Sequence, residues 1–228
     1  MLYFFILLNF LWADESLIAT GAVSKSDGLA KDFSYERYHD KKGDLIRDRS
    51  VYKKVDGAIA LEEFMETVNG KFLRYDVNQK QSAEKGWILI DNKHVIYGVQ
   101  DEDGQLKKVR RSLPKNFIVP LHLLPFIKDN WGKLIQGDSV SLKLGVWERK
   151  DHYSFYMKKV ESPKSLIIIK MQLSNIILRA FTSPMYFTFD KITEQIKTYQ
   201  GPLNLKEGEK GDFSDYIGFA KYSLKKAI

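Results

Sequence analysis

The chain has 228 residues, a formal net charge of +7 at pH 7 and 44% hydrophobic residues, so it has ample apolar surface for a folded core. It contains no cysteine, which excludes disulfides, thiolate metal sites, a cysteine nucleophile and the lipidated N-terminal cysteine of a bacterial lipoprotein. Exported eukaryotic domains of this size commonly carry disulfides. An exported chain without cysteine therefore suits a bacterial periplasm better.

The first thirteen residues are uncharged and nearly all apolar. This run is too short to span a bilayer comfortably, but it matches the apolar part of a secretory signal peptide. Ala13 precedes the polar Asp14-Glu15, so we expect residues 1–13 to be a signal peptide and residues 14–228 to be a single domain. No Lys or Arg precedes the run, and a start codon assigned too late would explain this. The alternative is that residues 1–13 form a buried strand or helix.

No later apolar run is long enough to cross a membrane. After cleavage we expect a soluble periplasmic protein without an integral membrane span.

Residues 119–137 are the best candidate for a packed helix. Pro125 is unfavourable inside a helix, so we expect a short turn that ends near Leu124 and a main helix that begins near Pro125. Gly137 is expected to cap the C-terminal end. The residues with the three- and four-residue spacing of one apolar helical face are Leu121, Leu124, Ile127, Trp131, Leu134 and Ile135.

Most other segments alternate apolar and polar residues between glycine-containing turns, as antiparallel strands do. Asn69-Gly70 is the strongest hairpin signal, since both residues tolerate positive φ. The predicted fold is mainly β (α+β): a curved antiparallel sheet or half-open β-barrel of about ten strands around one central helix. The main predicted strands are residues 17–23, 33–39, 58–68, 71–77, 87–90, 94–100, 105–113, 140–146, 153–157, 167–173, 185–189, 195–199 and 213–222.

Three further local predictions concern less regular segments. Residues 45–54 are markedly polar for a strand and are interpreted as a possible edge strand. Residues 175–181 are expected to contain a short helix. Gly201-Pro202 is predicted to form a turn.

Two segments resemble a poorly characterised family of exported bacterial proteins. They are FIKDNWGKLIQGDSVSLKLGV and YFTFDKITEQIKTYQGPLNL, and ATGAV with the following FSYERY is also similar. The resemblance assigns no chemistry. It implies a shape like the half-open β-barrels of periplasmic lipoprotein and lipid carriers, in which a curved sheet cups a helix around an apolar cavity. The positions that match the family pattern are Trp131, Leu134, Gly137, Asp190, Tyr199, Gly201 and Asn204.

Gly137-Asp138-Ser139-Val140 matches the nucleophile block of one class of serine esterases. A nucleophilic serine needs a base and oxyanion donors around it. In that class an Asp-x-x-His pair follows near the C-terminus, whereas here Asp91 and His94 precede the block. A helix cap at Gly137 and a strand that begins at Ser139 explain the four residues without catalysis, so we favour a non-enzymatic protein.

Other signs of chemistry are weak. The chain has four histidines, none of them at metal-ligand spacing to another. Paired carboxylates such as Glu62-Glu63 lie beside hairpin turns, where solvated side chains are the ordinary case. No phosphate-binding glycine loop is present. The sequence therefore predicts no cofactor, no metal site and no catalytic residue.

The densest basic run is KKVRR at residues 107–111. In an exported chain such a surface could meet anionic lipid headgroups, and we expect no nucleic-acid partner. We favour the simpler interpretation that it is a solvated strand edge, where lysine discourages pairing between sheets.

Aromatic and methionine side chains are the remaining signal. They could line an apolar site on the concave face of the sheet, since methionine suits adaptable apolar surfaces, or they could simply fill the core against the helix. The candidate ligand-binding residues are Trp87, Trp131, Trp147, Phe155, Met157, Met171, Met185, Phe187 and Phe189.

Two functions remain in competition. The first is a periplasmic binding or carrier module for a lipid, an acyl chain or a lipidated partner. The second is a structural or interaction protein of the cell envelope with a fully packed core and a protein partner. A cavity of several hundred Å³ would count against the second. A hydrolase is a weaker third possibility.

Overall fold

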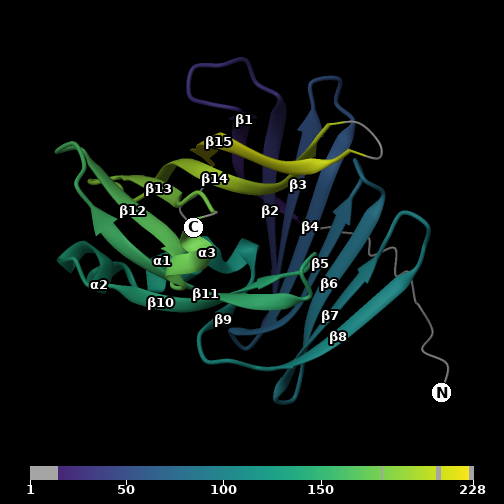
Figure 1. Ribbon diagram of the computed structural model, residues 1–228. Helices are drawn as coiled ribbons and strands as arrows, with labels where there is room; N and C mark the ends of the chain where they lie inside the picture. Colours follow the sequence, from purple (N-terminus) through teal and green to yellow (C-terminus); the bar gives the residue numbers. More distant parts are fainter. Residues whose placement is uncertain (1–14, 181, 209–211, 226–228) are drawn as a thin grey trace.

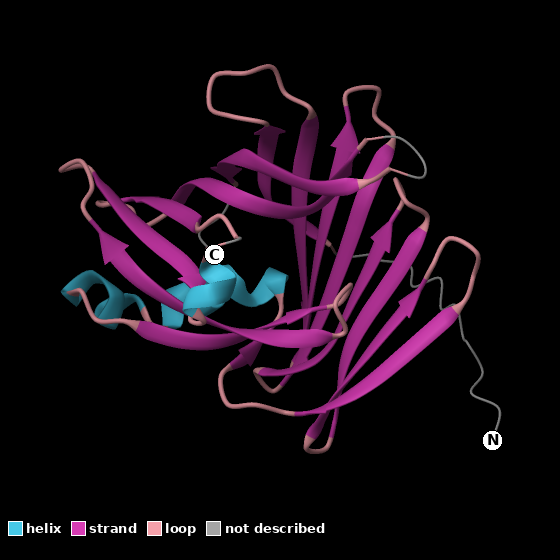
Figure 2. Ribbon diagram, viewed as in Figure 1, coloured by secondary structure: helices cyan, strands magenta, loops and turns pink. Residues whose placement is uncertain are grey.

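The computed structural model describes residues 15–180, 182–208 and 212–225. The expected signal peptide lies outside the described residues. Figure 1 labels the elements and Figure 2 shows that strands dominate. The strands are β1 (Ser16–Ser24), β2 (Phe33–Lys42), β3 (Leu45–Lys54), β4 (Ile59–Val68), β5 (Lys71–Gln79), β6 (Glu84–Asp91), β7 (His94–Gln100), β8 (Leu106–Ser112), β9 (Phe117–Ile118), β10 (Val140–Val146), β11 (Asp151–Val160), β12 (Leu166–Leu173), β13 (Met185–Asp190), β14 (Ile196–Glu207) and β15 (Ser214–Leu224). The helices are η1 (Pro120–His122), α1 (Leu123–Asp129), α2 (Trp131–Gln136) and α3 (Ile176–Arg179).

The fifteen strands of the described residues belong to one curled sheet, which runs β8-β7-β6-β5-β4-β3-β2-β1-β15-β14-β13-β12-β11-β10-β9. Neighbouring strands are antiparallel except β9 and β10, which are parallel. The mainly β prediction is confirmed, and the hairpin at Asn69-Gly70 has φ values of 52° and 71°. The basic run lies on β8, an edge strand as expected.

The predicted strand number of about ten is wrong. Most of the segments were recognised individually, but the estimated total was too low, and β9, only two residues long, was not expected. β9 exists because Phe117 and Ile118 pair with Lys143 and Leu144 of β10. No local pattern can reveal a strand that depends on such a tertiary contact.

The predicted single central helix is also wrong, because its segment divides into η1, α1 and α2 (Figure 2). Asn130 causes the division between α1 and α2: its side-chain Nδ2 donates to the carbonyl of Phe126 at 2.9 Å and its backbone leaves the helical region. Pro125 lies inside α1, near the start, where a missing N–H costs little. Gly137 ends α2 with a φ of 94°, as expected. The separate short helix is α3, capped by Asn175.

β3 is not an edge strand, since it lies between β2 and β4. Its polar residues have partners on both faces of the sheet. On the inner face, Ser50 is fully buried and donates to Glu63. On the outer face, Arg49 pairs with Glu62 at 2.9 Å. The polar residues of β3 therefore form hydrogen bonds and ion pairs within the sheet and do not indicate a solvated edge.

Gly201-Pro202 is not a turn. Both residues lie within β14, whose pairing with β15 shifts register between Pro202 and Lys206. A Cβ at Gly201 would lie 2.7 Å from Met185 and 2.8 Å from the Tyr199 hydroxyl. Glycine thus permits a close approach here, and the register shift accommodates the proline.

The two ends of the curled sheet meet through side chains, in a contact region that we call the seam. Trp147, in the turn between β10 and β11, packs on Gly86 of β6 and is 1% exposed. Within the described residues no backbone ladder joins β8 to β9. Three further pairs cross the seam: Phe72 with Phe117, Tyr97 with His152, and Arg111 with Asp151.

Gly86→Ala should lower the free energy of unfolding by about 1–3 kcal/mol, the usual cost of overpacking. A Cβ there would lie 2.0 Å from the buried ring of Trp147. Gly98→Ala is a matched control: its Cβ would lie 2.0 Å from Trp87, but that half-buried ring on the outer face can turn away. Urea unfolding of both variants provides the measurement, and equal losses would contradict the role of the seam.

Candidate functional site

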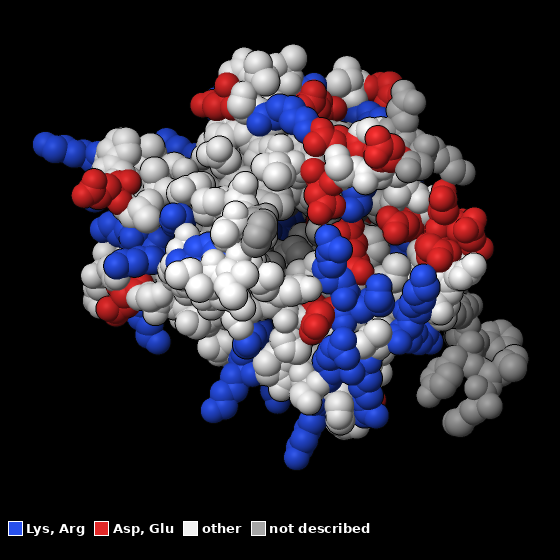
Figure 3. All heavy atoms as spheres, in the orientation of Figure 1, with Lys and Arg blue, Asp and Glu red and all other residues white. Residues whose placement is uncertain are grey.

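A cavity of about 260 Å³ lies between the helical segment and the inner face of the sheet. Figure 3 shows the surface hollowed near the middle of the face that it presents. Elements from much of the chain line the cavity: β2, β3 and β4, η1 and α1, and β10, β11, β13, β14 and β15. The curl of the sheet, rather than any one motif, therefore creates this site.

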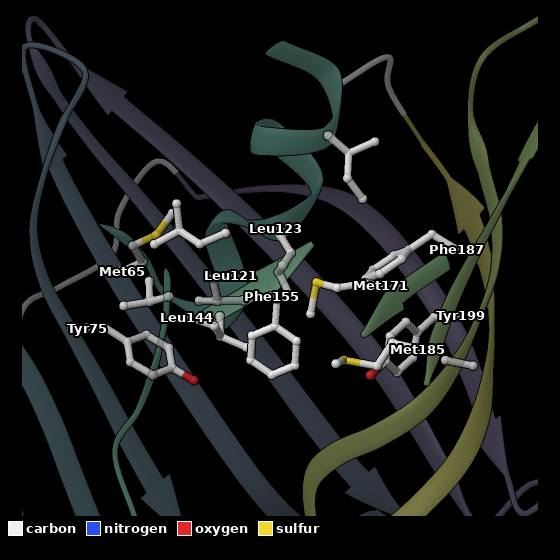
Figure 4. Packing of buried hydrophobic residues seen from close by; sticks show 14 of the residues in the cluster. Met65, Tyr75, Leu121, Leu123, Leu144, Phe155, Met171, Met185, Phe187 and Tyr199 are labelled. Atoms are coloured by element: carbon white, nitrogen blue, oxygen red, sulfur yellow. The ribbon is translucent and has the colours of Figure 1, made fainter. Parts of the chain in front are cut away.

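One part of the cavity wall is apolar. Figure 4 shows Leu121 and Leu123, from η1 and α1, between Tyr75 on one side and Met185 and Tyr199 on the other. The apolar lining residues are Pro120, Leu121, Leu123, Leu124, Leu144, Val146, Trp147, Phe155, Met185, Phe187, Ile196, Pro202 and Leu203. Such a wall suits an aliphatic or aromatic group.

The wall also carries a buried carboxylate. Glu63 of β4 is 3% exposed and lines the cavity. Its Oε2 accepts from Ser50 Oγ at 2.8 Å, and its Oε1 accepts from Asn204 Nδ2 at 2.7 Å and from the hydroxyl of Tyr75. Burial, followed by the neighbouring Glu63, raises the pKa of Tyr75 well above its ordinary value, so this hydroxyl remains a donor.

A buried guanidinium lies on the same inner face. Arg37 of β2 is 3% exposed, and its Nη2 donates to the carbonyl of Leu121 at 3.1 Å and lies 3.5 Å from Asp48 Oδ1. Its Nε has no hydrogen-bond partner among the described residues. The contact with Leu121 fixes η1 against the sheet, so Arg37 couples the helical segment to the cavity wall.

Three of the four tyrosines in the lining pack against one another. The ring of Tyr35 lies 5.0 Å from that of Tyr52 and 5.4 Å from that of Tyr222. Gly21 of β1 lies between Tyr35 and Tyr222 in the register of the sheet. A Cβ there would lie 2.8 Å from the carbonyl of Lys221, so only glycine lets the strands and rings pack this closely. Burial raises the pKa of Tyr35 to about 12.

Charged side chains also contribute to the lining near β10 and β15. Glu148 and Asp215 both line the cavity. Lys206 Nζ lies between them, 2.7 Å from Glu148 and 2.6 Å from Asp215. Burial raises the pKa of Glu148, while the contact with Lys206 opposes this shift.

The structure brings together four of the nine candidate residues, Trp147, Phe155, Met185 and Phe187, in the cavity wall. Three others are buried in the core without lining the cavity: Met157, Met171 and Phe189. Trp131 packs on Phe189 at 5.0 Å, away from the cavity. Trp87 lies on the outer face of β6, because its ring covers Gly98 while Gly86 and Ile88 face inward.

The polar lining residues were missed, although a signal for them exists. Arg37 is in phase with the inward-facing Phe33 and Tyr35 of β2, and Glu63 is in phase with Leu61 of β4. A charged residue in the apolar phase of a half-buried strand is the pattern that could have identified both.

The groups considered for catalysis or metal binding lie apart from one another. Ser139 Oγ donates to the carbonyl of Met157 at 3.4 Å. Asp91 and His94 flank the β6–β7 turn. Among the described residues no group of three His, Asp or Glu side chains is placed to hold a metal ion. No helix within the described ranges is both long and apolar enough to span a membrane.

Fold and site together define a mainly β protein whose open, curled sheet encloses a cavity. No family model and no curated protein matches the sequence. Among solved structures the chain is similar to a β-barrel-like protein of a domain of unknown function, DUF1849, from Brucella abortus. The TM-score is 0.41 at 9% identity, and the alignment covers 92% of this chain and 99% of that chain. This similarity is too distant to support an argument about function.

Tyr75→Phe should lower the free energy of unfolding by about 1.5–3 kcal/mol, because Glu63 would lose a hydrogen bond to a charged group. Tyr52→Phe is the matched control, since the Tyr52 hydroxyl has no hydrogen-bond partner among the described residues, and its effect should stay within about 0.5 kcal/mol. Urea unfolding compares the two. A loss in Tyr52→Phe as large as that in Tyr75→Phe would contradict this description of the network.

His122 should make folding sensitive to acid. Burial lowers its pKa, and Arg37 acts in the same direction, whereas Asp129 and Asp48 oppose the shift. The unfolded chain, with a histidine pKa of about 6.5, then binds more protons than the folded protein. The stability present above this pH is therefore lost as the pH falls.

Substitution of His122 tests this dependence. The wild-type free energy of unfolding minus that of His122→Gln should decrease as the pH is lowered from about 7.5 to about 5. Urea unfolding of both proteins at each pH measures the difference. A difference that is independent of pH would show that His122 has the same pKa in both states.

Proposed function

We propose that this protein is a non-enzymatic binding or carrier module for a compact apolar or amphiphilic ligand, and that it acts in the periplasm. The observation that carries the proposal is the cavity of about 260 Å³ between the helical segment and the sheet. An engineered cavity of about 150 Å³ holds benzene, and drug-sized ligands occupy about 300–1,000 Å³. The volume therefore favours a ligand larger than one aromatic ring, such as a short acyl chain.

The helical segment is the element that we expect to control access. Leu121, Leu123 and Leu124 form one side of the cavity. The hydrogen bond from Arg37 to the carbonyl of Leu121 ties η1 to the sheet. The break at Asn130 separates α1 from α2, so α1 can shift with η1 while α2 keeps its packing on the sheet.

The alternative is an envelope structural or protein-interaction domain with a fully packed core. The cavity disfavours that alternative, because a fully packed core leaves few voids larger than a water molecule. The hydrolase alternative has less support, since the hydrogen bond of Ser139 goes to a backbone carbonyl rather than to a base.

The localisation rests on the sequence. The uncharged apolar run at residues 1–13, the absence of cysteine and the resemblance to exported bacterial proteins all favour export. Fractionation of bacterial cells that express the full chain, followed by N-terminal sequencing, tests it. We expect periplasmic protein that begins at Asp14, and cytoplasmic protein that retains Met1 would contradict export.

Filling the cavity should abolish binding without unfolding the protein. Leu124→Phe on α1 and Val146→Phe on β10 add volume to the cavity wall and should weaken the uptake of a fluorescent apolar probe, N-phenyl-1-naphthylamine, at least about tenfold. Trp87→Phe, on the outer face, should leave uptake unchanged. Fluorescence titration gives the affinity, and circular dichroism checks the fold.

Native mass spectrometry of protein recovered from the periplasm complements the titration. The proposal expects a bound species that is reduced in both cavity-filling variants. A clean mass of the unliganded protein, together with no uptake of the probe by the wild type, would overturn the carrier function.

A further inference from the structure

The inner face of the sheet carries two opposite charges that do not pair with each other. Arg37, Ser50 and Glu63 are cross-strand neighbours on β2, β3 and β4. Neighbouring strands lie about 4.8 Å apart, so the backbones at Arg37 and Glu63 are about 10 Å apart with Ser50 between them. Both charged residues are 3% exposed and both line the cavity. A ligand in the cavity meets both charges.

Arg37 already has a charge partner. Its Nη2 lies 3.5 Å from Asp48, which is itself 6% exposed, and the same nitrogen donates to the carbonyl of Leu121 at 3.1 Å. An anionic ligand group at Nη2 would therefore compete with a carboxylate that is already in place, while Nε, without a partner among the described residues, can still donate to a neutral acceptor.

Glu63 has no charge partner among the described residues. Its donors are the hydroxyls of Ser50 and Tyr75 and the amide of Asn204, all of them neutral. Burying a carboxylate without a cation is costly even when it is hydrogen-bonded. Oε2 accepts only one of these bonds, which leaves it acceptor capacity for a further donor.

The other charged groups in the cavity wall add further negative charge to that of Glu63. Glu148 and Asp215 also line the cavity, and a single cation, Lys206, lies between them. The lining thus contains three carboxylates and one guanidinium, although the whole chain carries a net charge of +7. The field inside the cavity favours a cation and opposes an anion.

We propose that the ligand is an amphiphile with a protonated primary amine, whose ammonium group donates to Glu63 Oε2 while its apolar part lies against the leucines of η1 and α1. This inference rests on the proposed function, because it names the chemical class of the ligand of the same cavity. Ammonium is the simplest group that supplies both the missing charge and a hydrogen-bond donor.

Three probes with the same eight-carbon chain test the proposal at pH 7: octylammonium, 1-octanol and octanoate. Calorimetric titration of the wild-type full-length protein should give the tightest binding for octylammonium and the weakest for octanoate, with at least about a tenfold difference between them. This order of affinities tests the charge preference without any variant.

Glu63→Gln should reduce the affinity for octylammonium about tenfold or more, while 1-octanol binds as before. Glu62→Gln is the matched control, because Glu62 is the preceding residue on β4, faces outward and pairs with Arg49; it should not change the order of affinities. Tightest binding of octanoate, or an ammonium preference that survives in Glu63→Gln, would overturn this inference while octanol binding still supports the carrier function. Failure of all three probes to bind would overturn both.

Discussion

The rest of the structure depends on the closure of the sheet by side chains rather than by backbone hydrogen bonds. Fifteen strands curl until β6 and β7 face β10 and β11, and the buried ring of Trp147 on Gly86 holds this contact. Because the contact is made by side chains, its separation is set by their size and not by the fixed spacing of a strand ladder. The cavity exists because this spacing leaves room that η1 and α1 only partly occupy.

Within this closed sheet, the polarity of the inner face is not uniform. Methionine, phenylalanine and leucine side chains dominate the half formed by β10 to β13, whereas Arg37, Ser50 and Glu63 lie on β2, β3 and β4. Glu63 accepts three hydrogen bonds, and Arg37 donates to the carbonyl of Leu121 beside Asp48, which reduces the cost of removing these charges from water. An interior with one apolar half and one hydrogen-bonding half suits an amphiphile better than a pure hydrocarbon.

The sequence predicts those parts of this structure that depend on the local periodicity of apolar and polar residues. Alternation at residues 140–146, 167–173 and 185–189 matches β10, β12 and β13, because each of these strands has one buried face. The division of the helical segment at Asn130 depends on a single side-chain hydrogen bond, which periodicity does not report. β3 was misjudged because its inward-facing polar residues have buried partners on β2 and β4, and the pattern within one strand does not report such cross-strand contacts.

The difference between local pattern and tertiary contact also explains which residues of the candidate site were predicted. Trp147, Phe155, Met185 and Phe187 line the cavity, and their apolar character made them candidates. Trp87 belongs to a strand with large apolar residues on both faces, so composition alone could not say which face looks inward. Arg37 and Glu63 were missed because their partners come from other strands and from η1, and only the curl of the sheet brings these together.

The position of β1 beside β15 has a consequence for the connectivity of the protein. These strands pair in the middle of the sheet, with Ala19 opposite Leu224, while the consecutive strands β8 and β9 occupy its two outer edges. A circular permutant that joins the end of β15 to the start of β1 and opens the chain at residues 113–116 would trace β10 to β15 and β1 to β8 as one antiparallel meander. In the natural order, the β1–β15 ladder must instead close a loop of about 200 residues, so the permutant should have a lower contact order and fold faster.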